Sequence, residues 1–209
     1  DLHYPLRRQR QMCIRDSFHV SPVCAPTRSS LLTGRYSLRT GVTDTYNGGA
    51  IMSSTEITLA EIFAEKNYKT GIFGKWHLGD NYPSRPSDQG FQESVIHLAG
   101  GIGQVGDFTN YYAGNESYYD PALWHNNEIK KYEGYCSDIF TDEALKFIEQ
   151  NKSNQFFCYL SFNAPHTPLQ VPEKYYDLYK DIDPSNFYEE VTSETVSYTH
   201  LTLPTKRIV

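Results

Sequence analysis

Three short stretches of the sequence place cationic or proton-transferring side chains near one thiol. In CAPTR, Cys24 and Arg28 are close neighbours along the chain. In GKWHLG, Lys75 and His77 occupy alternate positions after a strand-like segment and therefore face the same side. In NAPHTP, His166 stands between two prolines. If the fold brings them together, these groups suit the binding of an anionic ester and the stabilisation of charge on its oxygens.

The surroundings of Cys24 are typical of a helix start. Pro26 suits a first helical turn, where its missing N–H has no partner to lose, and Gly34 suits the position just after the helix. Cys24 would then lie at or just before the N-cap, where free N–H groups and the helix dipole lower a thiol pKa. Arg28, one turn into the helix, can point back toward the same place.

Each motif also has a plainer interpretation. A cysteine at a helix start can be a small buried residue, and Cys158 in FFCYLSF is expected to be one. A Lys–Trp–His trio after a strand can be surface decoration, and a histidine between prolines can simply hydrogen-bond its own loop. The case for chemistry rests on the occurrence of all three motifs at the ends of predicted elements.

Those elements alternate between helix and strand. They are a helix over 58–68, a strand from 69 that ends at Gly74, a helix over 138–151, a strand over 155–162 and a helix over 172–179. The first helix begins with a capping box of Thr58 and Glu61, and the second strand is a continuous apolar run of the kind buried on both faces of a parallel sheet. This order indicates an α/β fold with a mainly parallel sheet, whose sites lie at the carboxyl ends of strands.

The region between these elements, residues 80–135, is expected to be irregular apart from short strand-like pieces such as SVIHLAG. GGIGQVG (100–106) lacks the lysine and the strand–helix context of a phosphate-binding loop, and we interpret it as a flexible loop. The tyrosine-rich stretch 109–132 is expected either to form one substrate-facing wall or to serve ordinary packing.

The composition excludes several classes of protein. A net charge of −6 argues against a nucleic-acid or anionic-membrane binder, and no apolar run reaches the ~20 residues that span a bilayer. The four cysteines form no CxxC pair, so neither a disulfide framework nor a zinc site is expected. Residues 1–17 and 196–209 do not continue the pattern of the body, and we interpret both as non-native, adapter-derived tails. The body, 18–195, is then expected to be an internal fragment of a longer protein.

Two of the motifs resemble signatures of the sulfatase family. CAPTRSSLLTGR and NYKTGIFGKWHLG are similar to its first and second signatures, and APHTPLQVP to the segment that holds a further active-site histidine. RPSDQGF matches a spacer common in bacterial members. The resemblance covers about residues 18–180. It implies a formylglycine-dependent (type I) sulfatase whose catalytic domain is part of an alkaline-phosphatase-like α/β sandwich, truncated at both ends. Its substrates would be sulfated carbohydrates or aryl sulfates.

The resemblance also implies a role for each candidate residue. A maturation enzyme would oxidise Cys24 to formylglycine, whose hydrate attacks sulfur with one hydroxyl and expels sulfate with the help of the other. Arg28 would hold this hydrate, and Lys75 would bind a sulfate oxygen. His77 would assist deprotonation of the hydroxyls. His166 would lie near the leaving oxygen as a hydrogen-bond donor or general acid.

Family members use a divalent cation, usually calcium, held by oxygen ligands. Cys24 as formylglycine would be one ligand, but the expected acidic ligands are missing: only Asp1 and Asp16 precede Cys24, and DIDPSN (181–186) is not assigned. We therefore expect the chain as given to be inactive. Bacterial sulfatases of this type also imply a periplasmic or secreted parent, although the chain shows no signal peptide.

Three alternatives remain open. The first is a phosphonate or phosphodiester hydrolase of the same superfamily. The second is a non-catalytic, glycan-binding relic in which Cys24 stays a thiol. The third is a cysteine hydrolase that pairs Cys24 with His77 or His166.

Overall fold

The computed structural model describes residues 20–111 and 117–181 of the 209-residue chain. Its centre is a five-stranded sheet with the strand order β4-β3-β2-β1-β5. The strands are β1 (Lys69–Lys75), β2 (Glu93–His97), β3 (Ala122–His125), β4 (Glu128–Lys131) and β5 (Phe156–Ser161). β1 runs parallel to both β2 and β5, whereas β3 and β4 are antiparallel. The expected α/β fold with a mainly parallel sheet is confirmed for the strands that carry the candidate residues.

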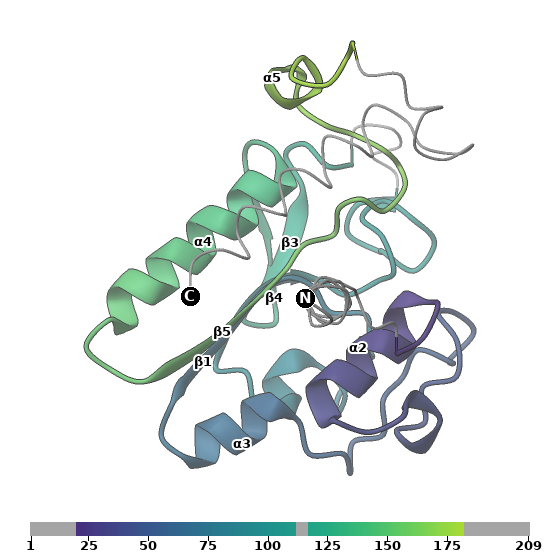
Figure 1. The fold of residues 1–209 in the computed structure, drawn as a ribbon, viewed down its shortest axis with the longest axis vertical. Helices are drawn as coiled ribbons and strands as arrows, with labels where there is room; N and C mark the ends of the chain where they lie inside the picture. The colour runs from purple at the N-terminus through teal and green to yellow at the C-terminus, as the bar shows by residue number, and fades with distance from the viewer. Residues whose placement is uncertain (1–19, 112–116, 182–209) are drawn as a thin grey trace, which may run out of the picture.

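Helices cover both faces of this sheet (Figure 1). They are α2 (Cys24–Thr33), α3 (Leu59–Glu65), α4 (Cys136–Asn151) and the short α5 (Glu173–Tyr176), with 3-10 turns η1 (Ser37–Arg39) and η2 (Pro86–Gln89). Successive residues of β1 serve different cores because strand side chains alternate between faces. Phe73 packs with Phe140 and Phe147 of α4, and Ile72 packs with Leu32 of α2 on the other face. The sheet is thus the middle of three layers.

Local signals in the sequence account for two of the helices. α3 begins with the predicted capping box: Thr58 Oγ1 accepts from the Glu61 N–H at 3.2 Å, and the Glu61 carboxylate accepts from the Thr58 N–H at 2.8 Å. α2 ends at Gly34, whose φ of 69° is the left-handed conformation that favours glycine. α2 begins at Cys24, however, two residues before Pro26. The placement of Cys24 at or before the N-cap is therefore wrong, and Val23 is the N-cap. Pro26 still fits, because the N–H groups of the first turn have no intrahelical partner.

The strand β5 differs from expectation in its burial. Side chains from Phe156 to Leu160 are half-buried, whereas the apolar run predicted burial on both faces. The reason is position: among the described residues, β5 pairs only with β1 and forms one edge of the sheet. Its last residue, Ser161, is buried.

The expectation of irregular structure over 80–135 is wrong for residues 122–131, which form the β3–β4 hairpin. The turn residues Asn126 and Asn127 have φ values of 47° and 71°, as a two-residue hairpin turn with both φ positive requires. Asn126 also accepts a hydrogen bond from the Ser94 N–H at 2.8 Å, which fixes the hairpin to β2. The signal, two asparagines between strand-like segments, was present in the sequence.

The tyrosine-rich stretch serves packing at several described positions. Tyr118 is fully buried in the core under α4, and Tyr132 is buried in the same core with 9% of its surface exposed. These side chains are not sugar-facing platforms, so ordinary packing is the correct interpretation for them.

In the residues that the structure describes, no helix combines the length and the apolar character that crossing a membrane needs. The predicted tails, 1–17 and 196–209, lie outside the described residues, as does most of DIDPSN.

Candidate active site

The candidate site lies where three parallel strands end beside the start of α2. Lys75, His97 and Ser161 are the last residues of β1, β2 and β5. Lys75 stands directly opposite His97 in the strand register, and Ser161 opposite Gly74. Cys24 lies in the first turn of α2. Its sulfur contacts the ring of His77, which follows the end of β1.

His77 lies between Cys24 and the 45–51 loop. Its Nδ1 is 3.3 Å from Cys24 Sγ, and its Nε2 is 2.8 Å from the carbonyl oxygen of Thr45. Since a carbonyl can only accept, Nε2 carries the proton and Nδ1 presents its lone pair to the sulfur. Burial, followed by the charge of Lys75, lowers the pKa of His77 to about 4. The ring is therefore neutral at pH 7 and can accept a proton from the side chain at position 24.

The backbone at His77 adopts an uncommon conformation that aims this ring. Its φ is 58°, in the left-handed region, which costs a non-glycine residue about 1–3 kcal/mol. The pairing of β1 and β2 continues past the strand ends and holds it: Trp76 N donates to His97 O and His77 N to Leu98 O, both at 3.1 Å. These two hydrogen bonds to the end of β2 and the residue after it offset the strain at His77.

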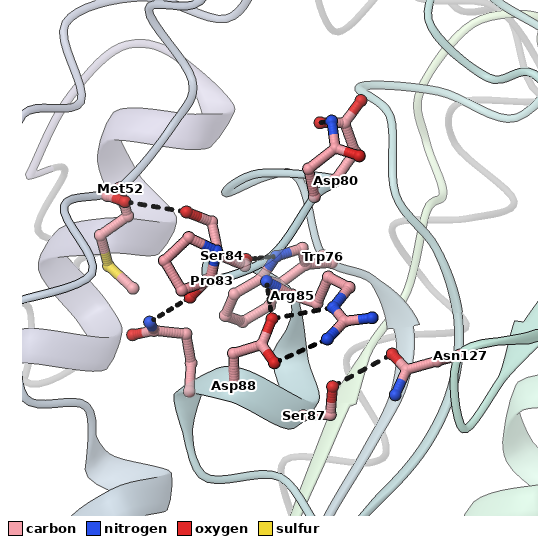
Figure 2. A network of polar contacts seen from close by, with 11 residues as sticks. Met52, Trp76, Asp80, Pro83, Ser84, Arg85, Ser87, Asp88 and Asn127 are labelled. Carbon is pink, nitrogen blue, oxygen red and sulfur yellow. Dashed lines mark hydrogen bonds and ion pairs between the residues drawn. The ribbon is translucent and has the colours of Figure 1, made fainter.

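A polar network fixes the segment that follows this turn (Figure 2). The Trp76 indole donates to the Ser84 carbonyl at 3.0 Å, and Arg85 binds both carboxylate oxygens of Asp88 at 2.8 and 2.9 Å. Ser87 donates to Asn127 at 3.0 Å and so ties η2 to the β3–β4 hairpin. The segment between β1 and β2 is therefore a rigid support behind His77.

Lys75 is a buried cation at the centre of the site, with 2% of its surface exposed. Burial, and then the nearby charge of Arg28, lower its pKa to about 8, while Cys24 partly offsets this shift. At pH 7 the side chain is still protonated. A buried ammonium with no carboxylate partner among its described neighbours is suited to an incoming anionic oxygen.

Arg28 connects α2 to the ends of two strands. Its Nη1 donates to the Lys75 carbonyl at 2.7 Å and also to the Ser161 hydroxyl, and Ser161 Oγ donates to the same Lys75 carbonyl at 3.0 Å. Burial lowers the pKa of Arg28, and the proximity of Cys24 acts in the opposite direction. Ser161 is a site residue that sequence reasoning missed, although a polar residue that ends an apolar strand was a usable signal.

His166 lies at the edge of this cluster. It is half-buried, and its Nδ1 is 2.9 Å from the Thr167 carbonyl oxygen. Burial is the main cause that lowers its pKa, and the charges of Lys75, His77 and Arg28 contribute to the same shift. The structure thus brings Arg28, Lys75 and His77 around Cys24, with His166 within electrostatic reach.

His97 is a second residue that sequence reasoning missed. Its ring is fully buried, and neither ring nitrogen has a hydrogen-bond partner among the described residues. Burial, then Lys75 and Arg28, hold its pKa well below the usual value, so the ring is neutral. A histidine that ends the apolar run SVIH was the available signal.

The loop GGIGQVG lies between the two site histidines. A Cβ added to Gly100 would lie 3.0 Å from His77 Cε1, and one added to Gly101 would lie 2.9 Å from His166 Nδ1. The buried Asp107 accepts from the Gly103 N–H at 2.8 Å and fixes the loop. The glycines allow the backbone to approach both rings closely.

A cleft of about 270 Å³ opens beside His77. Its walls come from the 45–51 loop, the turn after His77 and the loop over 98–106. Tyr46 and Val105 are largely exposed on these walls, and Asp80 supplies a carboxylate. Cys24 does not line the cleft and lies on the other side of the imidazole. The cleft therefore offers room for a polar ligand next to the reactive position.

The described residues do not fit the calcium site that the sequence resemblance implied. No group of three or more histidine, cysteine or acidic residues in 20–111 and 117–181 could hold a metal ion. The neighbours of Cys24 are cations or a neutral imidazole, whereas calcium needs several oxygen ligands.

Fold and site together place the chain in the alkaline-phosphatase-like superfamily. The family model described as sulfatase matches residues 6–199, and the chain belongs to the sulfatase family. An uncharacterized sulfatase of Schizosaccharomyces pombe is 32% identical over 190 residues, which cover 78% of this chain and 33% of that protein. The N-acetylglucosamine-6-O-sulfatase of Bacteroides thetaiotaomicron is 29% identical over 180 residues, 83% of this chain and 28% of that protein.

A solved structure also matches. Ps i-CgsB in complex with k-i-k-neocarrahexaose has a TM-score of 0.71 and 28% identity, over 87% of this chain and 42% of that chain. The chain spans about a third of the length of the curated relatives that it matches. The family and the fold expected from CAPTRSSLLTGR and GKWHLG are confirmed.

Proposed function

We propose that the protein containing this chain hydrolyses sulfate esters of carbohydrates, with residue 24 acting as formylglycine. The observation that carries this proposal is the pairing of Cys24 Sγ with the lone pair of His77 Nδ1 at 3.3 Å, beside the buried ammonium of Lys75. The sulfur stands in for the hydroxyls of the formylglycine hydrate. The hydrate supplies one hydroxyl to attack sulfur and a second whose deprotonation releases sulfate.

The chain's own residues would perform the remaining tasks. His77, held neutral and with Nε2 donating to Thr45, accepts the hydroxyl proton through Nδ1. Lys75 binds a sulfate oxygen and stabilises the negative charge that grows on it. Arg28 holds the start of α2 against the two strand ends and so fixes the position of residue 24. His166 acts at the leaving oxygen.

A carbohydrate substrate is supported by two of the relatives, whose names or titles refer to N-acetylglucosamine 6-sulfate chemistry and to a carrageenan oligosaccharide. The cleft beside His77 agrees with such a ligand, since it combines an exposed tyrosine, a carboxylate and backbone amides. A formylglycine-generating enzyme as partner, a calcium ion with ligands outside the described residues, and a periplasmic or secreted location belong to the same proposal. So does the division into a body of 18–195 with foreign tails.

Mass spectrometry tests the nucleophile directly. After co-expression with a maturation enzyme, the tryptic peptide that ends at Arg28 should lose the mass that separates a cysteine from its aldehyde. Cys158→Ala is the matched control and should leave this conversion unchanged, because Cys158 lies half-buried in β5, away from the motif. An unmodified thiol at Cys24 in the matured protein would contradict the proposal.

Turnover of an aryl sulfate, compared with an aryl phosphonate of the same phenol, tests the reaction. We expect the matured full-length protein that contains this chain to prefer the sulfate, and Cys24→Ala to abolish turnover. A preference for the phosphonate would replace this function by the phosphonate hydrolase alternative. A thiol-dependent turnover that survives without maturation would indicate a cysteine hydrolase.

A further inference from the structure

The side chain of Gln104 joins the GGIGQVG loop to the loop that carries His166. Its Nε2 donates to the Thr167 carbonyl oxygen at 2.7 Å and to Thr167 Oγ1 at 2.9 Å, across 63 residues of sequence. The same carbonyl oxygen lies 2.9 Å from His166 Nδ1. One acceptor on the main chain therefore binds both the glutamine amide and the imidazole.

This arrangement fixes which nitrogen of His166 carries the proton. A carbonyl oxygen can only accept, so the neutral ring must have its proton on Nδ1. Nε2 then presents a lone pair in the neutral ring and an N–H only in the imidazolium. A carbonyl oxygen has two lone pairs, and here His166 and Gln104 each use one. The glutamine thereby fixes the direction of the carbonyl to which the ring is bound.

Both partners are themselves held in place. The loop that carries Gln104 is closed by Asp107, whose N–H donates to the Gln104 carbonyl at 2.9 Å. On the other side, His166 N donates to the Asn163 carbonyl at 3.1 Å, and the Tyr118 hydroxyl donates to the His166 carbonyl. The backbone of His166 is thus fixed from the core, and its ring is fixed from the glycine loop.

Glycine at position 101 makes this contact possible. A Cβ there would lie 2.8 Å from Gln104 Oε1 and 2.9 Å from His166 Nδ1, so any larger residue would push the two side chains apart. Within the five residues GGIGQ, the glycines let the backbone approach His166, and Gln104 supplies the hydrogen bond to Thr167.

We propose that Gln104 is a positioning residue for His166. Through the Thr167 carbonyl it fixes the Nδ1-protonated tautomer and the orientation of the ring, and so presents Nε2 to the leaving oxygen of the substrate. In the imidazolium form the Nε2–H gives its proton to this oxygen, and the ring returns to the neutral Nδ1-protonated tautomer. The tautomer and the contact are properties of the chain itself. Only the assignment of Nε2 to the leaving oxygen rests on the proposed sulfatase function.

The first test is nitrogen-15 NMR of the histidine rings in the full 209-residue chain, with His166 assigned from the spectrum of His166→Gln. We expect the Nδ1-protonated tautomer in the wild type and a mixture of tautomers in Gln104→Met, which keeps the length of the side chain but has no donor. Gln92→Met is the matched control and should match the wild type. Gln92 is exposed and lies beside Thr70, at the opposite end of β1 from the site. An Nε2-protonated wild type, or an unchanged tautomer in Gln104→Met, would overturn the proposal.

A fold check accompanies this test. The amide spectra of Gln104→Met and Gln92→Met should both overlay on that of the wild type away from residues 100–107 and 163–168. If Gln104→Met loses its fold, Gln104→Glu provides the second variant, since a carboxylate has the same shape and cannot donate to the carbonyl. The tautomer mixture is expected in it as well.

The second test uses the matured full-length protein that contains this chain, with aryl sulfates whose phenols differ in acidity. Gln104→Met should lower kcat with little change in KM, and the loss should be largest for the poorest leaving group, which most needs a proton. An equal loss for all phenols, or a change in KM alone, would overturn the positioning role. If the tautomers behave as expected but no sulfatase turnover is seen, the proposed function fails, whereas the positioning of His166 by Gln104 stands.

Discussion

Gly74 packs directly against the backbone of Ser161 in β5, and replacing it with alanine should separate β1 from β5. Its φ is 118°, and an added Cβ would lie 2.6 Å from the Ser161 carbonyl carbon and closer still to its oxygen. These are backbone atoms, so no side chain can rotate away. The strands are in register here, with Gly74 opposite Ser161. The substitution should therefore shift the two strand ends that accept from Arg28.

The expected cost has two parts. A non-glycine residue in this region of φ costs about 1–3 kcal/mol, and overpacking against a rigid neighbour costs about 1–3 kcal/mol more. Gly74→Ala should thus destabilise the fold by about 2–6 kcal/mol. Gly34→Ala is the matched control: its φ is 69°, and an added Cβ meets nothing within 4 Å. It should cost only the backbone contribution, about 1–2 kcal/mol.

Urea denaturation followed by far-UV circular dichroism measures the difference. With a slope of about 2 kcal/mol per molar urea, Gly74→Ala should lower the midpoint by about 1–3 M and Gly34→Ala by about 0.5–1 M. Equal midpoints for the two variants would refute the reasoning, because both carry the backbone cost and only Gly74 carries the steric one.

Three further outcomes are expected. Inorganic sulfate should bind less tightly as pH rises through about 8, where Lys75 loses its proton, and Lys75→Met should remove this dependence in a calorimetric titration. His77 has a pKa of about 4 in the fold against about 6.5 when unfolded, so the unfolded chain takes up the proton first as pH falls. Wild-type stability should accordingly fall between pH 6.5 and 4 by about 3 kcal/mol relative to His77→Gln, as measured by denaturation at each pH; parallel pH profiles would contradict this. Phe147→Ala should cost about 3–5 kcal/mol because Phe147 lies on the buried face of α4 with 2% of its surface exposed, whereas Leu145→Ala, on the exposed face of the same helix, should change stability little.

Much of the fold followed from local signals in the sequence. The capping box at Thr58, the glycine at 34 and the apolar runs of β1 and β5 each determine structure over a few residues, so they could be recognised without a partner. The hairpin over 122–131 was missed because its strands are only four residues each and alternate weakly. The half-burial of β5 depends on its neighbours in the sheet, which the run of residues does not specify.

The candidate site was predictable only in part for a similar reason. Lys75 and His77 were expected to face one side, and the structure places both beside Cys24, although their roles stay predictions. Ser161 was missed because its role depends on Arg28 and on the Lys75 carbonyl of the neighbouring strand, and His97 because its burial depends on the packing of the sheet. The helix start was placed two residues too late because Pro26 tolerates several positions in a first turn.

The hydrogen bond between Arg28 and Ser161 bears on when the site forms during synthesis, as well as on where residue 24 lies. Its acceptor Ser161 lies 133 residues further along the chain, so at about 5–20 residues per second the ribosome needs on the order of ten seconds to supply it. Until then α2 has no anchor on β5, and residue 24 is not yet enclosed by the strand ends. An enzyme that modifies residue 24 during synthesis would therefore meet it before the strand ends enclose it.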